Sequence, residues 1–186
     1  MDALTIIQRI AVLPDSATEK LVTLFQGVVV DKNQNIIEAD RLSRSIYFIR
    51  TGSCRVFYHK DGREVILDFA FPGDALISLN SYVHGKRGYE TIQAMEDTTL
   101  YRIATTDLQT LFDQSVEIAN WGRKLAEMET LKIESRLMSK LFKTASESYA
   151  ELLERAPSMV NTIKLGFIAS YLGISQVTLS RIRAKI

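Results

Sequence analysis

The run SIYFIRTGSCRVFYHKDGREVILDFAFPGD, residues 45–74, decides the fold of this chain. It holds three short apolar runs separated by turn residues, with Gly52 after the first and Lys-Asp-Gly-Arg, residues 60–63, after the second. Gly62 suits the positive φ of a tight hairpin turn, and Pro-Gly-Asp ends the third run. Short strands at this spacing predict an antiparallel jelly roll or barrel.

The strand pattern extends outward from residues 45–74 to about residues 28–103, with ETIQAM (90–95) and TTLYRI (98–103) as its last runs. Two helices are predicted before it. ALTIIQRI (3–10) is amphipathic and is broken by Pro14. DSATEKLVTLF (15–25) begins with a capping box of Ser16 and Glu19, and Gly27 is expected to close it.

A long helix is predicted after the strands, from about residue 116 to 143. At about 28 residues it would be about 40 Å long, more than a β-roll of this size can cover. Its apolar seam is therefore expected to pair with the same helix of a second subunit in a homodimer. Packing against the chain's own β domain is the alternative for part of its length. The seam consists of Ile118, Trp121, Leu125 and Met128, and it drifts through Leu131, Leu137 and Met138 to Leu141.

Composition excludes several classes of protein. The chain has 186 residues, 46% of them hydrophobic, and a net charge of +1. No run approaches the roughly 18 apolar residues of a membrane span, and the first residues show no export signal. Cys54 cannot form a disulfide within the chain, and it is read as a small buried strand residue in a reducing cytoplasm. A cytoplasmic protein without a membrane partner is expected.

Charge is distributed unevenly along the chain. The last acidic residue is Glu154, and the final 32 residues carry a charge of +5, while the first 154 carry −4. A basic segment on a mildly acidic body fits a phosphate-binding footprint. An ordinary solvated face explains the charge equally well.

The run IASYLGISQVTLSRIRAKI, residues 168–186, fits a helix-turn-helix. Gly173 falls at the turn, and Ala169 is small where the two helices must approach each other. Ser175 is placed to cap the second helix. The apolar positions of this motif are filled by Ile168, Leu172, Ile174, Leu179 and Ile182.

The second helix of this motif has an outward face that suits the major groove of DNA. Arg181 can pair with guanine, Gln176 with adenine, and Val177 can touch a thymine methyl group. The remaining polar residues suit phosphate. The predicted DNA-facing set is Lys164, Ser175, Gln176, Val177, Thr178, Ser180, Arg181 and Lys185. Arg183 lies nearer the buried sector, and its role is left open.

The order of these parts resembles the Crp/Fnr superfamily of bacterial transcription regulators, most closely its short members of the Bacteroidetes type. The resemblance is carried by residues 45–74, by ETIQAMEDTTLYRI and by IASYLGISQVTLSRIRAK. It implies an α+β chain with a cyclic-nucleotide-binding-like double-stranded β-helix at 1–115, a dimerisation helix at 116–143 and a helix-turn-helix at 144–186. It also implies double-stranded DNA as a partner, with RNA polymerase as a further one.

Two departures from the family pattern matter. Cyclic-nucleotide binders of the family carry a Gly-Glu pair and an arginine, whereas here Ile77, Ser78 and Gly88 stand at those positions. Arg87 is one residue away, on the opposite face of a strand. A buried phosphate without a paired charge is costly, so cyclic AMP is not expected; another small effector or none remains open. The effector-pocket candidates are Ile77, Ser78, Leu79, Arg87, Tyr89 and Thr91.

The second departure is a missing wing after the last helix, which predicts weaker DNA binding.

No catalytic or metal-binding pattern is found in the sequence. His59 and His84 are far apart and lack a C-x-x-C partner, so no metal site is expected. HGKRG is not a P-loop, there is no G-x-S-x-G, and no cofactor is expected. The leading hypothesis is a dimeric DNA-binding regulator rather than an enzyme. The alternative is a ligand-sensing or protein-interaction module whose truncated C-terminal end does not read DNA.

Overall fold

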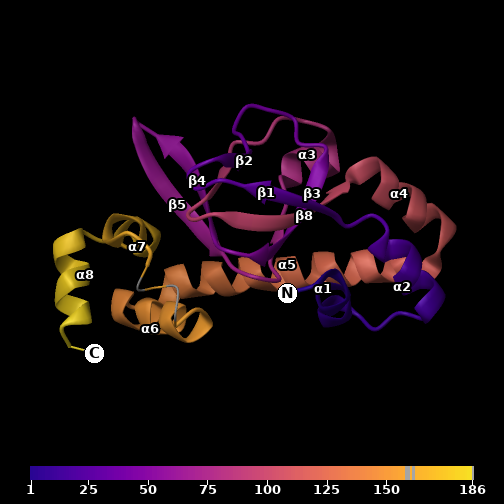
Figure 1. Cartoon of the computed structure of the whole chain (residues 1–186). Helices are drawn as coiled ribbons and strands as arrows, with labels where there is room; N and C mark the ends of the chain where they lie inside the picture. The colour runs from indigo at the N-terminus through magenta and orange to yellow at the C-terminus, as the bar shows by residue number, and fades with distance from the viewer. Residues whose placement is uncertain (158–159, 161, 186) are drawn as a thin grey trace.

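A β-roll lies along the long helix α5 in the computed structural model, which describes residues 1–157, 160 and 162–185. Two short helices pack beside one end of α5, and three C-terminal helices gather at its other end (Figure 1). The helices are α1 (Ala3–Ile10), α2 (Asp15–Val22), α3 (Leu79–His84), α4 (Thr105–Gln114), α5 (Val116–Phe142), α6 (Ala145–Arg155), α7 (Leu165–Leu172) and α8 (Gln176–Arg183). The strands are β1 (Gln26–Val30), β2 (Asn35–Ile37), β3 (Ser45–Thr51), β4 (Cys54–Lys60), β5 (Arg63–Ala70), β6 (Ala75–Leu76), β7 (Thr91–Ala94) and β8 (Thr98–Ala104).

The eight strands form two antiparallel sheets, in the orders β1-β8-β3-β6 and β2-β7-β4-β5. The predicted hairpin joins β4 to β5, with Lys60 paired to Arg63. Asp61 and Gly62 have φ values of 50° and 74°, as a type I′ turn requires. The apolar residues between the two sheets form one core cluster, which confirms the predicted roll.

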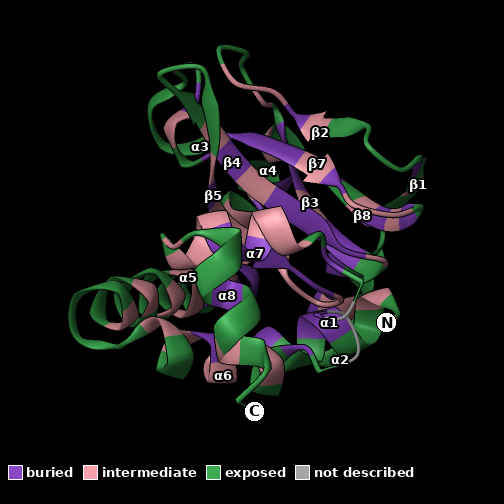
Figure 2. Ribbon diagram, turned by 90° about the vertical axis from the view of Figure 1, so that its left-hand side faces the viewer, coloured by how far each residue is buried: buried purple, intermediate pink, exposed green. Residues whose placement is uncertain are grey.

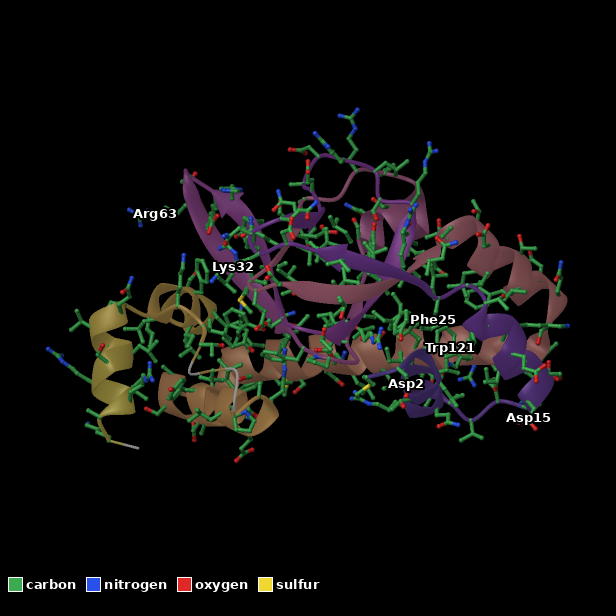
Figure 3. All side chains as sticks on the ribbon, viewed as in Figure 1. Asp2, Asp15, Phe25, Lys32, Arg63 and Trp121 are labelled. Carbon is green, nitrogen blue, oxygen red and sulfur yellow. The ribbon has the colours of Figure 1, made fainter. Side chains whose placement is uncertain are left out.

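The first half of α5 is covered by the chain itself, which corrects the predicted interface. Ile118, Trp121 and Leu125 lie in one core cluster with α1, α2 and strands β3 and β8, and Met128 packs against that cluster. Trp121 is fully buried, and its Nε1–H donates to the Ile7 carbonyl oxygen at 3.1 Å. Figure 3 shows Trp121 at α5 with Phe25 close by, on the side of the helix that faces the roll. The N-terminal helices supply the cover that the sequence argument assigned to a second subunit.

The start and end of the second helix also differ from the prediction. α2 begins at Asp15 after Pro14, and no side chain caps it, so the Ser16–Glu19 box does not form. The helix ends at Val22, and Gly27 lies in β1. A real capping box occurs later, where Thr144 and Glu147 bond reciprocally at the start of α6.

Cys54 lies inside the roll, as expected for a strand residue. Its side chain is buried with the apolar residues between the sheets. Burial, together with the nearby charge of Glu96, raises the pKa of this thiol to about 12. The group is therefore protonated at neutral pH, and it packs as a small apolar side chain.

Candidate nucleic-acid interface and ligand-binding region

Helices α7 and α8 are joined by a tight turn at Gly173. This residue has a φ of 69°, and its N–H bonds to the carbonyl oxygens of Ala169 and Ser170. The N–H of Ile174 donates to the Ala169 carbonyl oxygen at 3.0 Å, which completes a Schellman motif. The left-handed conformation explains why glycine stands here. The turn that the sequence predicted is therefore present, between two helices of eight residues each.

The start of α8 is stabilised by a side-chain cap. The Ser175 hydroxyl accepts a hydrogen bond from the Thr178 N–H at 3.1 Å, and the two hydroxyls lie 2.9 Å apart. The cap that the sequence predicted is thus observed. Both residues are exposed, so their hydroxyls can also be reached from solvent.

Helix α8 has one buried face and one exposed cationic face. Leu179 is buried and Ile182 packs against the same core cluster. On the other side Val177 is 62% exposed, and the surface of α8 is largely solvent-accessible in Figure 2. Among the residues that the structure describes, no carboxylate forms an ion pair with the bases on or next to α8. The exposed members of this face are Val177, Thr178, Ser180, Arg181 and Lys185; Arg183 is also exposed, but it lies beside the buried sector.

Two of the predicted DNA-facing residues make contacts within the terminal unit. A Cβ placed on Gly166 would lie 3.0 Å from Nε2 of Gln176, so the Gln176 side chain folds back against the start of α7. The ammonium group of Lys164 lies 5.5 Å from the centre of the Phe167 ring. Lys164 is nevertheless exposed, and a base contact by Gln176 requires a change of rotamer.

The terminal helices are attached to the outer side of the β4–β5 hairpin. Ser170 of α7 accepts a hydrogen bond from the Ile66 N–H and donates to the Glu64 carbonyl oxygen. The rings of Phe69 and Tyr171 lie 5.4 Å apart. Arg55 is buried with its guanidinium 4.1 Å from the centre of the Phe167 ring. These contacts fix the direction in which α8 faces solvent.

Not every base of the C-terminal segment is free for phosphate. Asp68 of β5 forms ion pairs with Arg155 of α6 at 3.3 Å and with Arg136 of α5 at 3.2 Å. Arg155 also donates to the Phe69 carbonyl oxygen. The charge of +5 that the sequence places after Glu154 therefore includes one base with a structural role.

The region around α3 holds the residues that the sequence resemblance aligned with a cyclic-nucleotide site. Ser78 and Gly88 are buried and lie together, because a Cβ placed on Gly88 would lie 2.4 Å from the Ser78 hydroxyl. The carboxylate of Glu90 is buried beside them. Its two oxygens would lie 2.8 and 2.9 Å from the same Cβ placed on Gly88. The Ser78 hydroxyl and one Glu90 oxygen have no hydrogen-bond partner. A buried carboxylate thus lies beside Gly88, the position at which the sequence resemblance implied an arginine in cyclic-nucleotide binders.

The other effector-pocket candidates do not converge on this site. Arg87 is exposed while its neighbour Gly88 is buried, but both precede β7, so the strand argument used for them does not apply. Leu79 and Tyr89 are 49% and 64% exposed. Ile77 packs against the core cluster that contains Trp121. The Thr91 hydroxyl accepts a hydrogen bond from the Ala39 N–H at 3.2 Å. Glu90 was missed because no sequence motif marks a buried acid at the start of a strand.

No cluster of metal-ligating side chains occurs within 1–157, 160 and 162–185. Over the same described residues, no helix is long and apolar enough to span a bilayer.

Residues 28–115, which include most of the roll, match the family model described as the cyclic nucleotide-binding domain. No curated protein sequence matches the chain. Among solved structures, FixK2 from Bradyrhizobium japonicum is 22% identical, with 87% of this chain and 83% of that chain covered and a TM-score of 0.73. The c-di-GMP-responsive global regulator CLP from Xanthomonas campestris is 12% identical, with 92% and 91% covered and a TM-score of 0.71.

A third similar structure is a transcriptional regulator assigned to the Crp/Fnr family, from Eubacterium rectale ATCC 33656. It is 19% identical, with 93% of this chain and 83% of that chain covered and a TM-score of 0.70. At these identities the likeness shows a shared fold. The shared fold extends beyond the roll, because most of each chain is aligned.

Proposed function

We propose that the protein is a homodimeric, sequence-specific DNA-binding transcription regulator of the Crp/Fnr type that does not respond to cyclic AMP. The observation that carries the proposal is the exposed face of α8, where Arg181 and Lys185 have no acidic partner among the described residues, next to the tight turn at Gly173. A helix with this face, held at its other side by Leu179, can enter the major groove of DNA. The residues before α5 form the ligand-sensing part, and those after it form the DNA-reading part.

Dimerisation is assigned to the second half of α5. Beyond Met128, the helix carries large apolar side chains that the chain does not cover. Leu131 and Met138 are 62% and 49% exposed, and their spacing of seven places them on one stripe. Lys132 and Arg136 point the other way, toward Asp74 and Asp68 of the roll. A second copy of the same helix would cover this stripe, which is completed by Leu137, Leu141 and Phe142.

Arg181 is assigned to base recognition and Lys185 to phosphate contact. Replacing Arg181 by alanine should cost about 1–3 kcal/mol of binding and relax preference at one base pair in each half-site. Lys185→Ala, the matched control, should weaken all sequences alike and flatten the salt dependence by about one unit. Selection of binding sites from random DNA, repeated with both variants, measures the base preference. Binding measured at several salt concentrations gives the salt dependence.

The wild type should select a two-fold motif whose half-sites lie about 34 Å apart, because a dimer presents two equivalent reading helices. A selection that yields no motif would support the alternative, a sensing module that does not read DNA. An unchanged motif with Arg181→Ala would remove Arg181 from recognition while leaving DNA binding itself intact.

Cyclic AMP should not bind with useful affinity. The proposal is supported by the buried Glu90 carboxylate beside Gly88, because a cyclic phosphate placed there would be repelled by a second anion in a desolvated site. Calorimetry at about 100 μM cyclic AMP should show no saturable heat, whereas a Kd of about 10 μM would be evident. Saturable binding that is strengthened by Glu90→Gln would show that the site still accepts the nucleotide.

A further inference from the structure

A hollow that Glu90 does not line is found between residues 38–44 and strands β2, β3 and β8. Its volume is about 290 Å³. This is close to the lower end of the range for small-molecule sites. Ile36 and Ile37 of β2 line it, and three arginines, Arg41, Arg44 and Arg102, surround it. The hollow is therefore mainly polar, and arginines dominate its charge.

The charges around this hollow are not balanced. Among the described residues, Glu38 is the only acidic one that lines it, and its carboxylate pairs with Arg41 at 2.9 Å. In the described part of the chain, no carboxylate forms an ion pair with Arg44 or Arg102. Two unpaired guanidinium groups beside one recess attract an anion.

Buried polar groups hold one of these arginines in place. Nε of Arg102 donates to the hydroxyl of Ser45 at 2.8 Å, and Ser45 is 5% exposed. The Ser45 carbonyl oxygen in turn accepts from the Ser43 hydroxyl at 3.2 Å. Tyr47 is paired with Arg102 across the β3–β8 ladder. The Arg102 side chain is thus already oriented by Ser45. Its two terminal nitrogens remain available to bind a ligand.

We propose that this hollow binds a small anionic molecule, one that carries a phosphate or carboxylate group, through Arg44 and Arg102. The site is separate from that around Glu90, yet it is tied to it. The Asp40 N–H donates to the Gly88 carbonyl oxygen at 2.9 Å, and the Ser43 N–H donates to the Ser81 hydroxyl at 3.1 Å. An anion that orders residues 38–44 would therefore also affect α3. This inference does not depend on DNA binding.

The test is calorimetry on the full chain at low ionic strength, with inorganic pyrophosphate and citrate as probes. At least one probe should bind saturably, one molecule to each protomer. Pyrophosphate alone would identify a phosphate site, and citrate alone a carboxylate site. Arg102→Gln and Arg44→Gln should each weaken binding by about tenfold or more, since each removes charge-assisted hydrogen bonds. Arg87→Gln is the matched control, because Arg87 is exposed nearby but does not line the hollow.

A substitution that increases affinity is a stronger test than one that decreases it, because misfolding can only weaken binding. Glu38→Gln releases Arg41 from its ion pair and should strengthen binding of the same probe by about threefold. The proposal is overturned if neither probe saturates, if Arg87→Gln weakens binding as much as Arg102→Gln, or if Glu38→Gln has no effect.

Discussion

A protein with aspartate at both Leu131 and Met138 should be monomeric at micromolar concentration and should lose specific DNA binding. Both side chains are exposed in the protomer, so the substitutions cost little there. In the proposed dimer each charge would be buried without a partner, at a cost of several kcal/mol per ion. With two such charges from each chain, the dimer dissociation constant should rise by at least about a thousandfold. Sedimentation velocity measures the mass directly.

Val116→Asp is the control for this pair of substitutions. Val116 is also an exposed apolar residue of α5, at 73%, but it lies at the first turn, far from the stripe. An acid at a helix start is favourable, so this variant should remain dimeric. A wild type that sediments as a monomer, or a double variant that remains a dimer, would exclude the second half of α5 as the interface.

Trp121→Ala should destabilise the protomer by about 3–5 kcal/mol, the usual cost of deleting a large buried side chain. The ring is fully buried, its centre lies 6.2 Å from that of Phe48, and its N–H holds the Ile7 carbonyl oxygen. Its loss leaves a cavity between α5, α1 and β3 as well as an unpaired carbonyl group. Unfolding by denaturant should be followed by circular dichroism rather than by tryptophan fluorescence, because the variant lacks the chain's one tryptophan.

Lys124→Ala, on the exposed side of the same helix, should change the free energy of unfolding by less than about 0.5 kcal/mol. Protein concentration must be held constant, since dimerisation adds to apparent stability. If Trp121→Ala dissociated the dimer without destabilising the protomer, the assignment of this residue to the chain's own core would fail.

The parts of the fold that local sequence rules govern could be predicted. Asp61 and Gly62 give the hairpin because a type I′ turn needs positive φ at both positions. Gly173 and Ser175 fix the end of α7 and the start of α8 for similarly local reasons. The extent of α5 was predicted to within a residue, because no proline interrupts it.

The parts that depend on tertiary contacts could not be predicted. The spacing of Ile118, Trp121 and Leu125 shows that they face a partner, but the sequence does not say whether that partner is α1 or a second chain. The Ser16–Glu19 box fails because Pro14 is the N-cap, so the helix starts two residues earlier than a cap at Ser16 would place it. Glu90 and Arg155 are charged, which predicts exposure, yet one is buried and the other is bound to Asp68. Only the folded chain brings these groups together.

The attachment of α7 to the β4–β5 hairpin has a consequence for the order of folding during synthesis. The hydrogen bond between Ile66 and Ser170 joins residues 104 apart in the chain, and Phe57 and Phe69 share a core with helices α6 to α8. At about 5–20 residues per second, the ribosome adds that distance in about 5–20 s. For that interval the outer face of the hairpin is apolar and uncovered on the nascent chain. The emerging roll therefore passes through a stage at which intermolecular strand pairing and chaperone capture compete with the arrival of its own C-terminal helices.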